Sequence, residues 1–67
     1  MTKRLMQLAI KNAIDAFNET MDTHMRIEKP DNNAEWYTLY VSNVRITSGT
    51  EEHILKRIKG INRENGV

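Results

Sequence analysis

The chain has 67 residues, with ten Lys and Arg against nine Asp and Glu, and it contains no cysteine. This length suits one domain with a thin core, and the lack of cysteine excludes disulfides, thiolate metal sites and a cysteine nucleophile. The balanced charge is unlike the basic excess of a dedicated nucleic-acid binder. No apolar run approaches the roughly 20 residues of a membrane span, so we expect a cytoplasmic protein without a membrane partner.

Residues 3–21 have the periodicity of one amphipathic helix. The side chains on about half of its circumference are apolar, and they are Leu5, Met6, Ala9, Ile10, Ala13, Ile14, Phe17 and Met21. Leu8 is the exception, since it projects among the polar residues. Lys11 and Asp15 stand four positions apart and are expected to pair on the solvent face.

After this helix, the spacing of the apolar residues changes to the two-residue period of an extended chain. Met25 and Ile27 alternate with polar residues, as in a half-buried strand. Residues 35–41 form a second run, rich in aromatic and β-branched side chains. Between them, residues 29–33 (Lys-Pro-Asp-Asn-Asn) are the clearest turn signal in the chain. The two runs are therefore predicted to pair as an antiparallel hairpin.

The stretch after this hairpin allows more than one register. In strict alternation Leu39 and Val41 share one face of the sheet, whereas Val44 and Ile46 fall on the other. A bulge at Ser42-Asn43 that flips the register explains this pattern, and it is the interpretation that we prefer. The alternatives are a turn at the same two residues into a third strand, and a long strand covered on both faces.

The C-terminal part of the chain predicts a second helix, from about residue 50 to 59. Residues 48–51 (Ser-Gly-Thr-Glu) fit a capping box with Ser48 as N-cap, and Thr50 is the competing cap. Gly60 suits the left-handed residue after the helix. We expect residues 1–61 to form a single domain and residues 62–67 a frayed tail. The fold class that follows is α+β in two layers: an N-terminal helix, an antiparallel β-hairpin or three-stranded meander, and a C-terminal helix.

Motifs of catalysis and cofactor binding are missing, because the sequence holds no GxSxG elbow, Walker loop or GxGxxG. His24 and His53 lie far apart in the sequence and lack the spacing of a zinc site, so we interpret both as partly exposed side chains. Glu51 and Glu52 are adjacent acids at a helix start, where acids are favoured for structural reasons. We therefore expect no enzymatic activity, no cofactor and no bound metal.

The aromatic strand provides the first candidate binding surface. Trp36, Thr38 and Tyr40 share one face of this strand, and they point outward if the alternate residues face the helices. Arg26 is then among their cross-strand neighbours. A face that combines Trp, Tyr and Arg suits a protein-binding hot spot, and it equally suits base stacking. The structural alternative is that Trp36 caps the edge of the core and Tyr40 packs over Arg26.

The last helix provides the second candidate surface, which is basic. Lys56, Lys59 and Arg63 lie on one side of this helix if it continues past Gly60, and there they suit contact with phosphates. The alternative, which we favour, is a solvated helix face on which Glu52 pairs with Lys56 one turn away.

The order helix, two or three strands, helix within this length resembles the topology of double-stranded-RNA-binding domains. Those domains contact phosphates with basic residues at the start of their last helix. Here the last helix starts with Thr50-Glu51-Glu52-His53, which is acidic, so the resemblance does not extend to RNA binding. In size and style the chain is also similar to phage and mobile-element accessory proteins that inhibit host machinery.

The leading functional hypothesis is a non-catalytic protein-binding module, an inhibitor- or adaptor-type regulator that self-associates as a dimer. The dimer is suggested by apolar side chains on both sheet faces, with Val44 and Ile46 on the outer one. The candidate binding residues are Arg26, Trp36, Thr38, Tyr40, Lys56 and Lys59. The alternative hypothesis is a nucleic-acid-binding protein that uses the aromatic face and the basic C-terminal helix.

Overall fold

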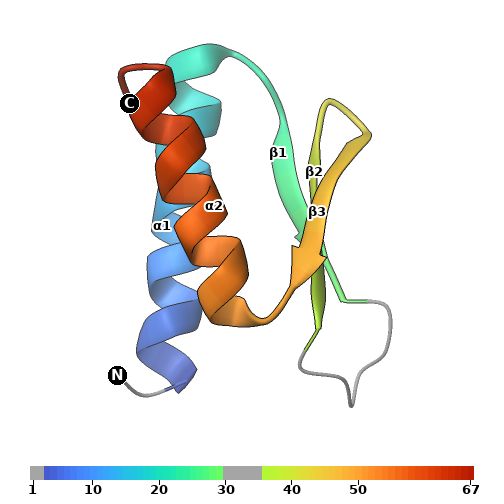
Figure 1. The fold of residues 1–67 in the computed structure, drawn as a ribbon. Coiled ribbons are helices and arrows are strands. Elements are labelled where there is room, and N and C mark those ends of the chain that lie inside the picture. The colour runs from blue at the N-terminus through green and yellow to red at the C-terminus, as the bar shows by residue number, and fades with distance from the viewer. Residues whose placement is uncertain (1–2, 30–35) are drawn as a thin grey trace.

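The computed structural model describes residues 3–29 and 36–67. Their elements follow the order α1 (Lys3–Met21), β1 (Met25–Glu28), β2 (Tyr37–Val41), β3 (Val44–Gly49) and α2 (Glu51–Glu64). The strands form one antiparallel sheet in the order β1-β2-β3, and both helices lie against the same face of it (Figure 1). This arrangement confirms the predicted α+β fold in two layers. Most of the turn predicted at residues 29–33 lies outside the described residues.

The hydrophobic core fills the space between the helix pair and the sheet. Its buried side chains are Ile10, Phe17, Met25, Tyr37, Leu39, Ile54, Leu55 and Ile58. They come from α1, β1, β2 and α2, so the predicted inward direction of Met25 and Leu39 is confirmed. None of the described helices combines the length and the hydropathy that crossing a bilayer requires.

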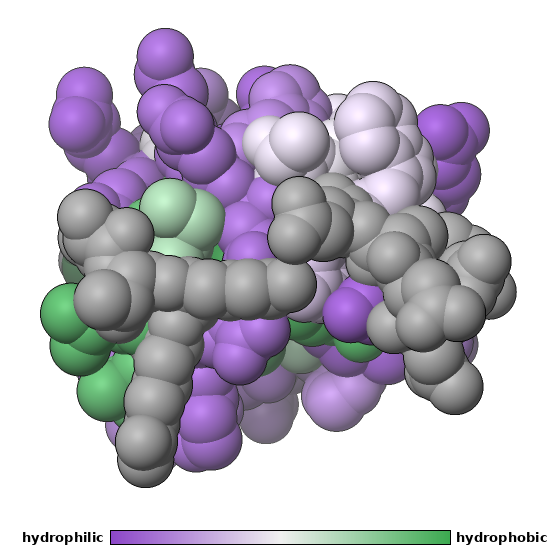
Figure 2. Space-filling view, turned by 90° about the horizontal axis from the view of Figure 1, so that it is seen from below, coloured by the Kyte–Doolittle hydropathy of each residue, from purple (hydrophilic) through white to green (hydrophobic). Residues whose placement is uncertain are grey.

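The apolar face predicted for α1 is confirmed along most of the helix, including Met6 in the first turn, but not at Leu5. Leu5 is 54% exposed, and Leu8, the expected exception, is 52% exposed. Figure 2 views the molecule from the end at which α1 begins, and it shows hydrophobic surface gathered at one edge, on the side of the helices. Lys11 Nζ lies 2.9 Å from Asp15 Oδ2 on the solvent face of α1, which confirms the predicted pair.

The connection from α1 to β1 is held by a side chain of the helix. Asn18 donates from Nδ2 to the Met25 carbonyl at 3.1 Å and accepts from the Met25 N–H through Oδ1 at 2.6 Å. Asp22, just after the helix, has φ 50°, a left-handed conformation that aspartate tolerates better than most residues. Because both polar groups of Met25 are satisfied by Asn18, β1 starts at a fixed position beside the end of α1.

Ser42 and Asn43 form a turn into a third strand, so the preferred interpretation of a bulge at these residues is wrong. Their φ values are 52° and 66°. Positive φ at both central residues is the signature of a two-residue hairpin turn whose twist matches that of the flanking strands. The Ser42 N–H also donates to the His24 carbonyl at 2.9 Å, which ties this turn to the start of β1. The three-stranded alternative is therefore the correct one.

A bulge does occur, but it lies in β3. Leu39 pairs with Thr47 and Tyr40 pairs with Arg45, so Ile46 is the extra residue between them. Ile46 packs against the core cluster. Val44 pairs with Val41 and therefore lies on the helix side of the sheet, although it is exposed at the sheet's end. The prediction that Val44 and Ile46 occupy the outer face is wrong, because strict alternation does not hold across a turn and a bulge.

Helix α2 begins later and ends later than expected. Its N-cap is Thr50, whose hydroxyl accepts from the His53 N–H at 3.4 Å, so the competing cap is the one used and Ser48 remains in β3. Gly60 lies inside the helix, which continues to Glu64, and Gly66 with φ 74° follows instead. The continuation is stabilised by α1, since Asn62 is buried and donates from Nδ2 to the Ala13 carbonyl at 3.1 Å. Residues 62–64, which we expected to lie beyond the helix, are thus part of it.

Candidate functional site: the open sheet face

The sheet leaves one face uncovered by the helices, and paired residues of all three strands line it. Directly paired residues of neighbouring strands point to the same side of a sheet. The pairs that alternate with the core positions are Arg26 with Tyr40, Glu28 with Thr38, Thr38 with Ser48, and Tyr40 with Arg45. We call these residues, Arg26, Glu28, Thr38, Tyr40, Arg45 and Ser48, the outer face. The sequence predicted Arg26, Thr38 and Tyr40 on this surface, and the structure places them there.

Arg26 is held in one position on the outer face by its neighbours. Its guanidinium carbon lies 4.3 Å from the centroid of the Tyr40 ring, in cation–π geometry. Its Nη1 lies 2.6 Å from Glu28 Oε1, and its Nη2 donates to Asn43 Oδ1 at 3.4 Å. The structural alternative considered from the sequence, in which Tyr40 packs over Arg26, is therefore the arrangement observed. The same contacts leave an ordered aromatic and cationic pair on the surface.

A second set of polar contacts crosses from β2 to β3. Thr38 Oγ1 and Ser48 Oγ share a hydrogen bond of 3.1 Å. Arg45 donates to the same Ser48 oxygen from Nε at 3.3 Å and from Nη2 at 3.2 Å. Sequence reasoning did not place Arg45 or Ser48 at the site, since their positions opposite Tyr40 and Thr38 depend on the bulge at Ile46. The Ser42-Asn43 pair was the available signal, because it is typical of a tight hairpin.

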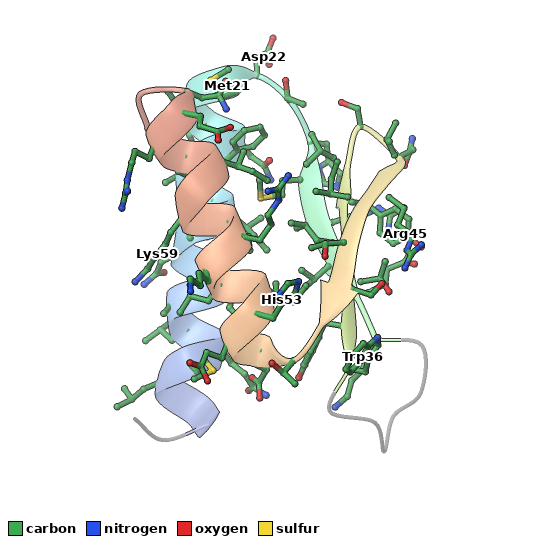
Figure 3. All side chains as sticks on the ribbon, viewed as in Figure 1. Met21, Asp22, Trp36, Arg45, His53 and Lys59 are labelled. Atoms are coloured by element: carbon green, nitrogen blue, oxygen red, sulfur yellow. The ribbon has the colours of Figure 1, made fainter. Side chains whose placement is uncertain are left out.

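Trp36 lies at the end of the sheet where β2 begins. It precedes the first residue of that strand and is 50% exposed. Figure 3 shows it at this end of the sheet, whereas Arg45 lies farther along the outer side. Four positions separate Trp36 from Tyr40, which corresponds to about 13 Å of extended chain. Trp36 is therefore an exposed aromatic group at the margin of the outer face.

The structure separates the basic residues of α2 from the outer face. Lys56 and Lys59 are exposed on α2, and Figure 3 shows Lys59 on the side of the helices, with the sheet between α2 and Arg45. The pair predicted between Glu52 and Lys56 is not among the ion pairs of the described side chains, which include Lys11–Asp15 and Arg26–Glu28. The two predicted binding surfaces are thus on opposite sides of the molecule.

The histidines occupy separate positions. His53 lies in the first turn of α2, as predicted, and its Nε2 is 2.9 Å from Thr47 Oγ1. His24 is exposed just before β1. No group of three His, Cys, Asp or Glu side chains with metal-binding geometry exists among residues 3–29 and 36–67.

The chain is thus a two-layer α+β domain with the element order helix, three strands, helix. One face of its sheet, which carries polar and aromatic side chains, is not covered by the helices. Comparisons of the chain with protein-family models, with curated proteins and with solved structures found no match.

Proposed function

We propose that this chain is a small non-catalytic protein-binding module, an inhibitor- or adaptor-type regulator that engages its partner through the outer face and Trp36. The observation that carries this proposal is the Arg26–Tyr40 stack at 4.3 Å on a sheet face that neither helix covers. Trp, Tyr and Arg dominate the binding energy of protein interfaces, because they bury large areas and also form directed polar contacts.

The contacts within the outer face support a role in protein binding. Arg26 is already immobilised by Tyr40 and Glu28, so little side-chain entropy is lost when a partner covers it. The face also carries both signs of charge, with Glu28 beside Arg26 and Arg45. Mixed charge gives an interface specificity toward one complementary protein surface. We infer a partner that presents a carboxylate to Arg45 and an apolar group to Trp36.

The nucleic-acid alternative has weaker support from the same geometry. A backbone of phosphates lying on the outer face would meet Glu28, which already pairs with Arg26. Lys56 and Lys59 lie on the opposite side of the molecule and cannot add to that contact. Helix α2 also has Glu51 and Glu52 in its first turn, and their negative charges oppose the phosphate binding that a helix N-terminus otherwise favours. Steep salt dependence of binding distinguishes this alternative from the proposal.

Replacing Trp36 or Tyr40 with alanine is expected to weaken partner binding about tenfold or more while the fold is retained. The partner is first captured from lysate in nuclease-treated and untreated samples and then purified, and binding is measured by calorimetry. Lys59→Ala is the matched control, because Lys59 is exposed on the opposite side, and its affinity should equal that of the unsubstituted chain.

Two outcomes contradict the proposal. Loss of the captured partner on nuclease treatment, together with weak binding by Lys59→Ala, would indicate a nucleic-acid ligand. Circular dichroism that shows Trp36→Ala or Tyr40→Ala unfolded would place that residue in the core, and the assignment of the outer face would then be wrong.

In the absence of a partner, we further propose that two copies associate through their outer faces. A two-fold dimer places the same patch against itself, and the presence of both Arg26 and Glu28 makes this patch self-complementary in charge. Sedimentation equilibrium at concentrations on the order of tens of micromolar should give a mass above the 7.8 kDa of one chain. The Trp36→Ala variant should shift toward the monomer. A mass of one chain at every concentration would contradict this proposal.

A further inference from the structure

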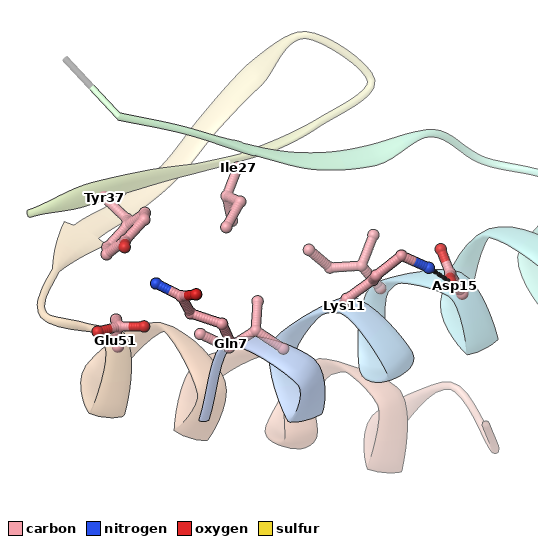
Figure 4. A pocket seen from close by; sticks show the side chains of 8 residues that line it. Gln7, Lys11, Asp15, Ile27, Tyr37 and Glu51 are labelled. Carbon is pink, nitrogen blue, oxygen red and sulfur yellow. Dashed lines mark hydrogen bonds and ion pairs between the residues drawn. The ribbon is translucent and has the colours of Figure 1, made fainter. Parts of the chain in front are cut away.

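A cleft lies on the helix side of the sheet, between α1, the edge of β1–β2 and the first turn of α2. Its volume is about 260 Å³, and its lining residues are Gln7, Ile10, Lys11, Ile14, Asp15, Ile27, Tyr37 and Glu51. Figure 4 shows Ile27 and Tyr37 on the sheet side, Gln7 and Lys11 on the side of α1, and Glu51 at one end. Pockets for drug-sized ligands measure roughly 300–1,000 Å³, so this cleft fits a smaller group.

Glu51 is buried, and the preference for acids at the start of a helix, which explained this residue from the sequence, does not explain its burial. Its side chain is 9% exposed, and its Oε2 atom is shielded from solvent without a hydrogen-bond partner among the described residues. As the first residue of α2, it lies where the helix dipole favours a negative charge. A buried carboxylate oxygen without a donor is costly, and a structure retains such a group when an ordered water, an ion or a ligand satisfies it.

Among the described residues that line the cleft, Glu51 is the only charged residue without an ion-pair partner. Lys11 and Asp15 pair with each other at 2.9 Å at the opposite end (Figure 4). Lys29 Nζ lies 5.5 Å from the centroid of the Tyr37 ring and forms no ion pair with Glu51. Between the two ends, the wall is formed by Ile10, Ile14 and Ile27. A ligand that places a cation at Glu51 and an apolar group against the isoleucines therefore matches both the charged end and the apolar wall of the cleft.

We propose that this cleft binds a protonated amine carried on a short apolar stem, with Glu51 accepting its hydrogen bonds. The stem packs on Ile10, Ile14 and Ile27, and the ammonium replaces the missing donor at Oε2. The same chemistry occurs in a free alkyl- or arylamine and in a lysine side chain of a peptide. The cleft lies on the side of the sheet away from the outer face, so this site is independent of the proposed protein-binding surface.

The test is a titration of the full chain with matched probes, followed by two-dimensional NMR and by thermal unfolding. The probes are phenethylamine, its neutral analogue 2-phenylethanol, and the anion 3-phenylpropanoate. We expect the amine to shift the signals of Gln7, Ile14, Ile27 and Glu51 and to raise the unfolding midpoint. Its affinity should exceed that of the alcohol about tenfold, as a charge-assisted hydrogen bond requires, and the anion should not bind.

Glu51→Gln retains the shape of the side chain and removes its charge, so the preference for the amine over the alcohol should disappear. Glu52→Gln is the matched control, because Glu52 is the next residue of the same helix turn but is exposed, and the preference should remain. Ile14→Phe, which fills the cleft, should abolish binding of both probes even if Glu51→Gln does not fold.

Two probes separate the sources of the amine. Tighter binding of the capped peptide acetyl-Phe-Lys-amide than of phenethylamine indicates a lysine of a partner, and the reverse order indicates a free amine. The proposal is overturned if no probe binds at about 10 mM, which means that water alone satisfies Glu51. It is also overturned if the amine and the alcohol bind equally, or if Glu52→Gln has the same effect as Glu51→Gln.

Discussion

Replacing Leu39 with alanine is expected to lower the free energy of unfolding by about 2–5 kcal/mol. Leu39 is fully buried in the middle strand, where it contacts a core built from both helices. Removing its branched end leaves a cavity between the two layers, because neither helix can move inward without losing its other contacts. A domain of this length is only marginally stable, so a loss of this size unfolds a large part of the population.

Chemical denaturation followed by circular dichroism measures this effect, and Leu8→Ala is its matched control. The substitution is the same, but Leu8 is 52% exposed on a helix, and alanine has the highest helix propensity. We expect the control to change the unfolding free energy by less than about 0.5 kcal/mol. Equal losses for the two variants would mean that Leu39 does not occupy the core.

Replacing Gly49 with alanine is expected to cost about 1–3 kcal/mol through overpacking. Gly49 is buried opposite Tyr37 at the end of β3, and an added Cβ atom would lie 2.5 Å from Cδ2 of His53. The His53 ring cannot turn away freely, since its Nε2 atom is 2.9 Å from Thr47 Oγ1. Thermal unfolding of the variant measures the cost.

Two further variants separate the steric cause from a general effect of losing a glycine. Gly60→Ala lies within α2 with nothing within 4 Å of the added atom, so it should stabilise the chain by roughly 0.5–1 kcal/mol. In a double-mutant cycle, Gly49→Ala should cost less when His53 is already alanine, because the ring atoms at 2.5 and 2.8 Å are removed and only Cβ of residue 53, at 3.0 Å, remains close. An unchanged cost in that background would show that contact with the His53 ring is not the reason.

Patterns within single elements predicted much of the fold. Helix α1 follows from an uninterrupted apolar periodicity, and the strand pair β1–β2 follows from alternation on both sides of a turn signal. These signals are local, because a side chain's direction along a helix or strand repeats every few residues. Leu39 and Val41 were placed toward the helices on this basis, which also placed Arg26, Thr38 and Tyr40 on the outer face.

The errors occurred where local patterns allow two conformations. Ser42-Asn43 suits both a bulge and a tight turn, and pairing with β2 selects the turn, which moves the bulge to Ile46. Gly60 suits a helix end, but burial of Asn62 against α1 more than offsets the modest cost of a glycine inside the helix. In both cases a contact distant in sequence is worth more than the local preference.

The amino-acid sequence therefore determines the two helices, the β1–β2 hairpin, the absence of cysteine chemistry, and an aromatic and basic surface on that hairpin, whereas the third strand was only an alternative interpretation. Tertiary structure alone places Arg45 and Ser48 beside Tyr40 and Thr38. It also packs α2, which carries Lys56 and Lys59, against the other face of the sheet, and it buries Glu51 at the end of the cleft. The reason is physical: periodicity records which face of an element is buried, but not which other element covers that face. The outer face and the Glu51 cleft are the two surfaces on which the proposed functions can be tested.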